Sequence, residues 1–444
     1  MKQELKGSSK KKPLSRRSLL KRSAGVIAVP FIVPSSVLGS QTPGNQLRLG
    51  CIGVGRMGRD NMMGALNLGL EKSINARIVA VCDVDMKRAK HAKSDVDKKY
   101  AEYGKNSTVR IYEDFRELLA NKDIDAVIIA TPDHQHAVNG VAAANAGKDI
   151  YLQKPLTYSI AEGQKLVKAV RKNKVILQTG SQQRSSIYFR KTCELVRNGR
   201  IGKLQCIEVV IPTDHGEGVS TPMEVPENLN YDMWLGPAPK APYTEHRVHP
   251  QRGYGRPGWL QVEQYCRGMI TGWGSHMYDI AQWALGSELD SGPMDIEAEA
   301  EFPDRGLFDV HVGYQAWATY ANGVKMVSHN GSPGVNFIGS DGWIWVERGR
   351  FKAHDQDIFR GEAGVIKLYE SKDQMGNFLE CVRSRKNPIA PVEAGHRANS
   401  ICIIHHIAMK LKCKLTWDPR AEKFTNNNEA NGMLDFSHRM GWEV

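Results

Sequence analysis

The stretch between residues 47 and 70 constrains the fold more than any other part of this 444-residue chain. Its apolar run "LRLGCIGVG" is bounded by glycine, as buried strands are, and a helical pattern follows from about Met57 to Leu70. The junction reads G-x-G-x-x-G: its glycines permit a tight turn, close approach of the backbone to a pyrophosphate, and close helix–strand packing. The helix N-terminus would face the phosphate charge. We therefore predict a dinucleotide site, rather than a mere turn, at Gly53, Gly55, Arg56, Met57 and Gly58.

Strand and helix patterns keep alternating after this unit. The runs "ARIVAVCDVD" (76–85), "IDAVIIATP" (124–132) and "DIYLQKP" (149–155) resemble further buried strands, and "KVILQTGSQQR" (174–184) resembles a last one. Helical patterns separate them. This alternation predicts βαβ units and a doubly wound parallel sheet, which we place as an N-terminal α/β Rossmann domain at residues 47–185.

The chain changes character beyond residue 185. Residues 212–262 are rich in Pro, Gly, Trp and His with little periodicity, and such long irregular segments are usually functional. Residues 294–354 follow a β pattern, in which Asn322-Gly323 predicts a two-residue hairpin turn. Helical patterns return near the C-terminus. Residues 186–444 are therefore predicted to form an α+β domain on a mostly antiparallel open sheet.

Polar residues follow the ends of several predicted parallel strands, where open α/β sheets bind ligands. Asp83 ends the second strand, where a ribose-binding carboxylate is expected, and it would repel a 2′-phosphate, which favours NAD over NADP. Lys87 and Arg88 lie close by and weaken that preference. In "ATPDHQH" (130–136), two histidines and Asp133 lack a further ligand of suitable spacing, so we expect no metal. A loop beside the nicotinamide is the better interpretation, with contacts from Thr131, Pro132 and His136.

Lys154 stands at the next strand end, and Pro155 restricts its backbone. An isolated lysine there is more often a surface residue, but at this edge it would point into the crevice. G-x-G-x-x-G, "ATPDHQH", "YLQKP" (151–155) and "TGWGSHMYD" (271–279) resemble, in this order, the motifs of the Gfo/Idh/MocA family of glucose–fructose oxidoreductase, inositol dehydrogenase and relatives. "GSQQRS", "MWLGPAPKAPYTEHRVHP" and "LTWDP" resemble its secreted bacterial branch.

The resemblance implies an enzyme that binds NAD or NADP, acts on sugars or polyols and often forms dimers or tetramers. Residues 186–444 would then bind substrate and mediate oligomerisation. Lys154 matches the lysine that hydrogen-bonds the reacting hydroxyl and touches the nicotinamide ribose, beside Gln153. His276 matches the usual acid/base. Two departures stand out: Gln153 replaces a glutamate, and Gly272 stands where the family places an aspartate.

His276 is plausible as a base on physical grounds as well, because a helix that opens just before it disfavours imidazolium. Asp279 lies three residues on, where it could orient the ring or contact substrate, or serve only packing. Trp234, Trp259 and Trp273 could stack on a sugar ring or fill the core. Further candidates for the sugar site are Arg184, Tyr188 and His215, for each of which a structural role is the better interpretation, and Trp273, for which burial in the core is equally open.

Residues 1–40 resemble a twin-arginine export signal: a basic segment, "SRRSLLK" at 15–21, an apolar stretch and then small residues. Residues 41–46 form a polar linker. The formal charge is +12, but residues 1–22 carry +8 of it, so the remaining +4 disfavours nucleic-acid binding. The apolar stretch is short for a membrane span, so we expect no stable insertion after processing. The eight cysteines fit buried free thiols better than disulfides.

These features predict an exported enzyme, periplasmic or extracellular, that oxidises a sugar, polyol or glycoside hydroxyl. Free NAD is not expected outside the cytoplasm, so the cofactor would be loaded before export, retained, and reoxidised within each cycle. Two alternatives stay open. One is an NAD-dependent glycosidase or epimerase that works by transient oxidation. The other is an NAD-retaining sugar-binding protein impaired in catalysis, which Gly272 would suggest.

Overall fold

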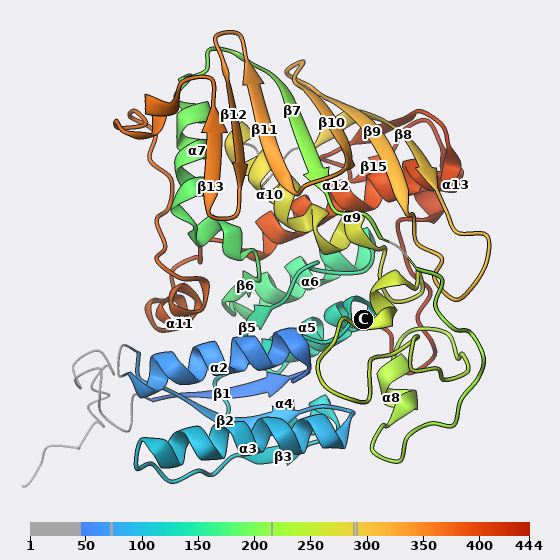
Figure 1. Cartoon of the computed structure of the whole chain (residues 1–444). Helices are drawn as coiled ribbons and strands as arrows, with labels where there is room; N and C mark the ends of the chain where they lie inside the picture. The colour runs from blue at the N-terminus through green and yellow to red at the C-terminus, as the bar shows by residue number, and fades with distance from the viewer. Residues whose placement is uncertain (1–45, 72–73, 215, 287–288, 290–291) are drawn as a thin grey trace, which may run out of the picture. The chain divides into compact units, whose positions relative to one another are not determined.

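Six parallel strands form the first sheet of the computed structural model, in the order β3-β2-β1-β4-β5-β6 (Figure 1). The structure describes residues 46–71, 74–214, 216–286, 289 and 292–444. The strands are β1 (Leu47–Ile52), β2 (Ala76–Cys82), β3 (Arg110–Tyr112), β4 (Ala126–Ile129), β5 (Asp149–Leu152) and β6 (Leu177–Thr179). The connecting helices are α2 (Arg56–Leu70), α3 (Met86–Glu102), α4 (Phe115–Ala120), α5 (His136–Asn145) and α6 (Ile160–Asn173), with short 3₁₀ turns η2 (Asp133–Gln135) and η3 (Gln182–Ser185).

This sheet is the doubly wound parallel sheet that the alternating pattern predicted. Strands β4 and β5 are buried at every position, because helices cover both faces of a parallel sheet. Helix α6 begins with a capping box, in which the Ser159 hydroxyl accepts from the Glu162 amide and the Glu162 carboxylate accepts from the Ser159 amide.

The second sheet has nine strands in the order β13-β12-β11-β7-β10-β9-β8-β14-β15. Strand β7 pairs with β10 in parallel, and the other described pairs are antiparallel, as predicted. The strands are β7 (Leu204–Ile211), β8 (Pro293–Glu301), β9 (Gly313–Tyr320), β10 (Lys325–Asn330), β11 (Gly334–Gly339), β12 (Trp343–Glu347), β13 (Arg350–Ala353), β14 (Leu415–Asp418) and β15 (Lys423–Phe424).

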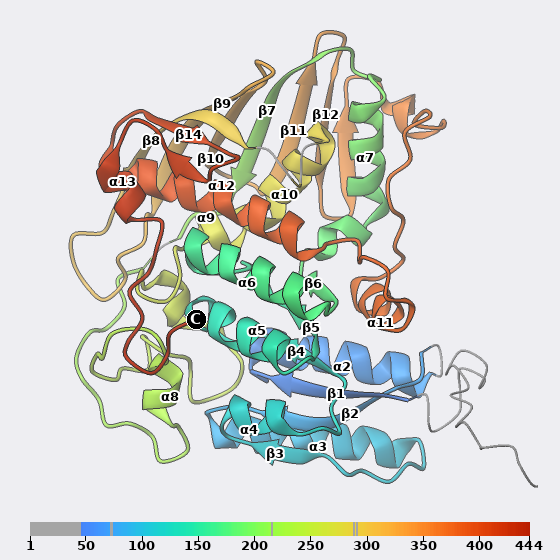
Figure 2. The ribbon, with the colours of Figure 1, turned by 180° about the vertical axis from the view of Figure 1, so that it is seen from behind.

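Helices α7 (Ile187–Arg197), α10 (Gly274–Leu285) and α12 (Val392–Leu411) cover one face of the second sheet (Figures 1 and 2). The other face is open: along β9 the side chains alternate, and Trp317 is exposed on it. Short helices complete this part, namely α9 (Met269–Gly272), η5 (Gln356–Phe359) and α13 (Asn428–Gly432).

Two C-terminal pieces return to the first sheet. Helix α11 (Gln374–Ser384) places Phe378 edge-on against Tyr151 in the core beneath α2. The last residues pack Trp442 against Phe115 of α4. Residues beyond 185 therefore also contribute to the core of the N-terminal sheet.

The irregular segment 212–262 is anchored to the edge of the Rossmann sheet. Its described elements are α8 (Tyr231–Leu235) and η4 (Gly258–Gln261). Backbone hydrogen bonds join Met86 to Asn228 and Asn230 to Val84, just beyond β2. An aromatic core around Trp234 and Tyr265 fixes the rest of the segment.

The predicted signal (1–40), all of the linker except its last residue, and His215 lie outside the described residues. All eight cysteines lie within them, and each carries a free thiol, six of them buried, as predicted. Among the described helices, none is both long and apolar enough to cross a bilayer.

Candidate active site

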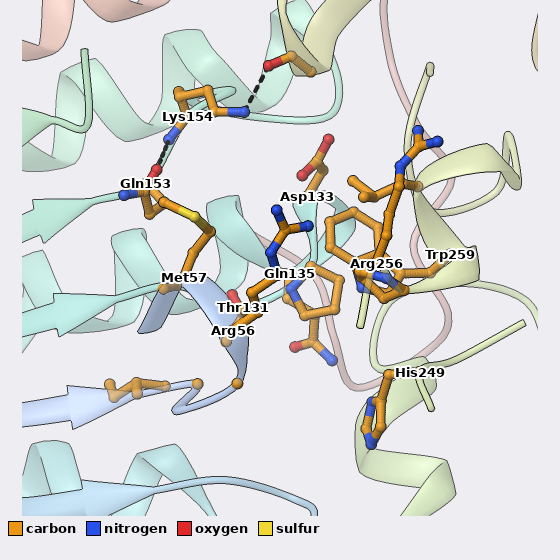
Figure 3. Close-up of a pocket in the computed structure, with 18 of the residues that line it drawn as sticks. Arg56, Met57, Thr131, Asp133, Gln135, Gln153, Lys154, His249, Arg256 and Trp259 are labelled. Atoms are coloured by element: carbon orange, nitrogen blue, oxygen red, sulfur yellow. Dashed lines mark hydrogen bonds between the residues drawn. The ribbon is translucent and has the colours of Figure 1, made fainter. Parts of the chain in front are cut away.

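A cavity of about 520 Å³ opens at the carboxyl ends of the parallel strands. Turns after β1, β2, β4 and β5 line one side of it. Segment 212–262 lines the other side (Figure 3), and α9, the start of α10 and the β12–β13 turn complete it. The sequence placed its candidate residues at this edge, and most of them meet here: Gly53, Gly55, Arg56, Met57, Asp83, Thr131, Pro132, Gln153, Lys154, Trp273 and His276.

The glycine turn has the shape that a pyrophosphate needs. Gly53 has a φ of +76°, and a Cβ there would come within 2.7 Å of the Ala130 carbonyl oxygen. A Cβ at Gly58 would lie 1.8 Å from the Gly53 carbonyl oxygen, so Gly58 packs α2 onto the turn rather than lining the cavity. Gly55 precedes α2, and no side chain caps the first amides of this helix. These amides are donors for an anion at a helix N-terminus, so the turn fits a dinucleotide.

Asp83 faces the cavity with a fixed carboxylate. Its two oxygens accept from the backbone amides of Val54 and Asp85, each at 2.9 Å. Burial raises the pKa of Asp83, and the charge of Arg88 partly offsets this. The Arg88 guanidinium lies 2.8 Å from where a Gly55 Cβ would stand, so it reaches over the phosphate turn.

Lys154 extends from the end of β5 toward the second half of the chain. Its ammonium donates to the Gly272 carbonyl oxygen at 2.6 Å (Figure 3). Burial lowers the pKa of Lys154. The neighbouring Gln153 donates to Asn61 of α2 at 2.7 Å, so its amide ties the strand end to the helix that starts at the phosphate turn.

His276 occupies the first turn of α10 and is 3% exposed. Burial, together with the charges of Lys154 and Arg348, lowers the pKa of His276 well below its usual value, so the imidazole is neutral and can accept a proton. Its Nδ1 is buried without a hydrogen-bond partner in the described part of the chain.

Gly272 leaves open space where the resemblance implies a carboxylate. A Cβ at this position would meet only the Met269 sulfur, at 4.0 Å. Packing therefore does not require a glycine here. The wall between Lys154 and His276 carries no side chain at residue 272.

Asp133 was missed as a functional candidate, although it lies in "ATPDHQH". The carboxyl lines the cavity near Lys154 (Figure 3), is 4% exposed, and has one oxygen, Oδ2, buried without a hydrogen bond to a described residue. Burial raises its pKa to about 7, although the charge of Lys154 opposes this. Its signal in the sequence was an acidic residue directly after a strand-end Thr-Pro. Arg348, in the β12–β13 turn, and Arg256 and His249, in the irregular segment, also line the cavity and were missed.

Asp279, predicted to have a catalytic role, and Arg184, predicted to contact the sugar, are not brought to the cavity. The two buried side chains form a bidentate ion pair, with N–O distances of 2.8 and 2.7 Å, and neither lines the cavity. Tyr188 also lies outside the cavity lining and packs against Phe351. A helical spacing of three places Asp279 near His276 in sequence, but its carboxylate turns toward η3.

His136 was predicted to contact cofactor and does not line the cavity. Its ring nitrogens lie 2.6 and 2.9 Å from the carbonyl oxygens of Pro155 and Thr131. It therefore positions the two backbone segments that carry Lys154 and Thr131. The three tryptophans Trp234, Trp259 and Trp273 all line the cavity. Trp234 is also part of the aromatic core.

Residues 47–181 match the NAD-binding Rossmann fold of the Gfo/Idh/MocA oxidoreductases, and residues 213–444 match the C-terminal alpha/beta domain of the same family. The myo-inositol 2-dehydrogenase of Thermotoga maritima is 30% identical over 163 residues, 37% of this chain and only 44% of that protein. The scyllo-inositol 2-dehydrogenase (NAD(+)) of Bacillus subtilis is 25% identical over 360 residues, covering 78% of this chain and 89% of that protein.

Among solved structures, the WlbA dehydrogenase of Bordetella pertussis, determined with NADH and UDP-GlcNAcA, matches with a TM-score of 0.62. At 16% identity, over 84% of this chain and 99% of that one, it shows a shared fold. The two family matches together span nearly all of the described residues, and they agree with the glycine turn and the two sheets. The chain belongs to the Gfo/Idh/MocA family of oxidoreductases and has its NAD-binding Rossmann domain.

Proposed function

We propose that this protein oxidises a hydroxyl group of a sugar, polyol or glycoside, with NAD retained in the protein and reoxidised within each cycle by transfer of the hydride to a carbonyl carbon of a second sugar or of the oxidised substrate. One observation carries the proposal. Lys154, from the Rossmann sheet, and His276, from the domain with the antiparallel sheet, line one cavity together with the dinucleotide turn. A hydride donor and its acceptor need this arrangement, with proton-handling groups beside the cofactor.

In this proposal NAD, when bound at the glycine turn and Asp83, supplies the hydride acceptor. The Lys154 ammonium donates a hydrogen bond to the oxygen of the reacting hydroxyl, and neutral His276 accepts the hydroxyl proton. The C–H electron pair leaves as hydride, so a carbonyl forms. Trp259 and Trp273 offer faces for the sugar ring.

Two relatives of this chain support a polyol or sugar as the substrate. Their names state that they are inositol 2-dehydrogenases, and a cyclic polyol offers a secondary hydroxyl of the kind that Lys154 and His276 would engage. The longer of these matches covers both domains, including residues on each side of the cavity.

Retention of NAD and export are proposed together. The signal-like sequence in residues 1–40 supports export. Retention is supported by segment 212–262, which is hydrogen-bonded to residues 85–91, next to the predicted ribose-binding Asp83. His249 lies 3.0 Å from an Asp85 oxygen, the Arg88 guanidinium donates to the Pro250 carbonyl, and Tyr254 lies 2.9 Å from the His91 ring. These links span more than 160 residues of sequence, and opening them would be needed for release.

The first experiment asks whether NAD is a resident group. The full chain, purified as expressed and then denatured, is expected to release stoichiometric NAD(H). Gly58→Ala is expected to release almost none, because its Cβ would collide with the Gly53 carbonyl and distort the phosphate turn. Gly64→Ala, on the same helix with nothing within 4 Å of the new Cβ, is the matched control and should keep its NAD(H). A cofactor-free wild-type protein would refute retention.

The pH dependence of hydride exchange tests the cavity acids. Asp133 is protonated below its pKa of about 7 and ionised above it. The pKa of His276 lies too low to titrate there. Oxidation is expected to accelerate as pH rises through about 7, because ionised Asp133 adds a proton acceptor beside Lys154. Asp133→Asn should abolish this increase in rate near pH 7. Asp304→Asn, which replaces an exposed carboxylate, should preserve it. An unchanged increase in Asp133→Asn would remove Asp133 from the mechanism.

The open wall at Gly272 favours one further candidate function, a cofactor-retaining binding protein without turnover. It predicts tightly bound NAD and sugar binding without transfer of deuterium from a labelled sugar to the cofactor. A glycosidase or epimerase would instead transfer deuterium transiently and release a cleaved or epimerised product. The homo-oligomer implied by the resemblance stays a prediction, which light scattering of the purified chain would check.

A further inference from the structure

Arg348 is a cavity residue that the proposed mechanism does not use. It lies in the tight turn between β12 and β13, and its guanidinium carbon is 4.4 Å from the centre of the Trp273 ring. Trp273 in turn packs edge-to-face with His276, with 6.3 Å between ring centres. Stacking on Trp273 therefore holds the guanidinium at the catalytic end of the cavity.

This guanidinium has no carboxylate partner among the described residues. Arg256, another arginine of the cavity wall, differs, because it donates to the buried Asp214 carboxylate at 2.6 Å. The positive charge of Arg348 also reaches the catalytic pair, since it lowers the pKa of both His276 and Lys154. Arg348 is an exposed residue of the cavity lining, and an arginine that is stacked there without a carboxylate partner has donors available for a ligand.

The surrounding wall is favourable to negative charge. Residue 272 carries no side chain and has open space before it, and Lys154 adds a second cation. Asp133 is the nearby carboxyl of the lining, and its raised pKa leaves it partly neutral at pH 7. Asp83 and Glu113 line the cavity from the ends of β2 and β3, toward the adenosine side.

We infer that the substrate is a saccharide bearing an anionic group, a carboxylate or a phosphate, which Arg348 binds while Lys154 and His276 engage the reacting hydroxyl. This inference rests on the proposed function and names its substrate class. A planar guanidinium pairs with either anion through two parallel hydrogen bonds, and such charge-assisted bonds change affinity by about 10- to 100-fold.

The test is calorimetric binding to the NAD-loaded full chain. The probes are D-glucuronate and D-galacturonate, each against its parent hexose, and glucose 6-phosphate. At least one anionic sugar is expected to bind about 10- to 100-fold more tightly than its neutral parent. Arg348→Gln should remove that preference and leave the affinity for the parent hexose unchanged. Arg350→Gln is the matched control, because Arg350 is exposed, pairs with Glu347 and does not line the cavity. Tighter binding of a uronate identifies a carboxylate as the anionic group, and tighter binding of glucose 6-phosphate identifies a phosphate.

Two outcomes would overturn the inference. In one, no anionic sugar binds more tightly than its parent. In the other, Arg348→Gln weakens anionic and neutral sugars alike. Deuterium transfer from the same sugars to bound NAD is recorded in parallel. Transfer from neutral sugars without an anion preference refutes only this inference, whereas anion-selective binding without any transfer refutes the proposed oxidation.

Discussion

Lys154→Met should abolish hydride exchange almost completely, by about 10²- to 10⁴-fold, while NAD stays bound. The lysine ammonium is the only charged donor in the described structure that extends from the end of β5 into the cavity, where it is held by the Gly272 carbonyl at 2.6 Å. Methionine keeps the length and apolar stem of the side chain but cannot donate to a hydroxyl oxygen. The loss should appear in turnover more than in sugar affinity, because the hydrogen bond strengthens as negative charge develops on the oxygen.

Two controls separate this chemistry from a folding defect. Lys165→Met replaces an exposed lysine on the adjacent helix α6 and should leave exchange intact. The NAD content of Lys154→Met, measured after denaturation, should equal that of the wild type, since the glycine turn is untouched. Near-normal exchange in Lys154→Met would exclude this residue as the hydroxyl donor.

The sequence was sufficient to predict the parts of the site that depend only on residues close together in the chain. Gly53, Gly55 and Asp83 are fixed by what a turn between a parallel strand and a helix requires, and Lys154 by its position at a strand end. The same local logic explains why β4 and β5 were recognised: continuous apolar runs are what a strand covered on both faces needs.

The features that depend on contacts between distant segments, or on burial, were not predicted from the sequence. Arg348 reaches the cavity only because β12 and β13 pair beside it, and Asp133 becomes a group with a pKa near 7 only once buried. The predicted turn at Asn322-Gly323 is longer than two residues. The Tyr320 amide donates to Val324, so Ala321 to Gly323 form the loop, with Gly323 at a φ of +83°. A glycine after a type I turn gives this three-residue form, which a dipeptide signal alone does not distinguish.

Asp279 shows most clearly how spacing can mislead. Its position three residues after His276 suggested a shared helical face, but a helix surface has room for several neighbours, and the partner was Arg184 of η3. Arg184 is buried too, donates to the Ile389 carbonyl at 3.1 Å, and lies over the Trp283 ring at 5.0 Å. The ion pair thus joins the segment after β6 to α10 and to the loop before α12.

Removing one partner of this pair should therefore lower the free energy of unfolding and leave the hydride exchange of the folded protein unchanged. Arg184→Leu is expected to destabilise the protein by about 3–5 kcal/mol, because it leaves the Asp279 carboxylate buried without its cation. The double variant Arg184→Leu/Asp279→Leu should recover much of that loss, since it removes the stranded charge together with its partner. Urea midpoints of the two variants and of Asp279→Leu measure this coupling.

The same variants decide between structure and catalysis. At a temperature where each is folded, hydride exchange per molecule of bound NAD should match the wild type in the double variant, because neither side chain lines the cavity. If the double variant were stable yet lost exchange as Lys154→Met does, Asp279 would have to act on His276 after all. If instead only the single variants unfold early and the double variant keeps exchange, the uncompensated buried charge is what destabilises them, and α10 holds His276 at the cavity wall without the ion pair.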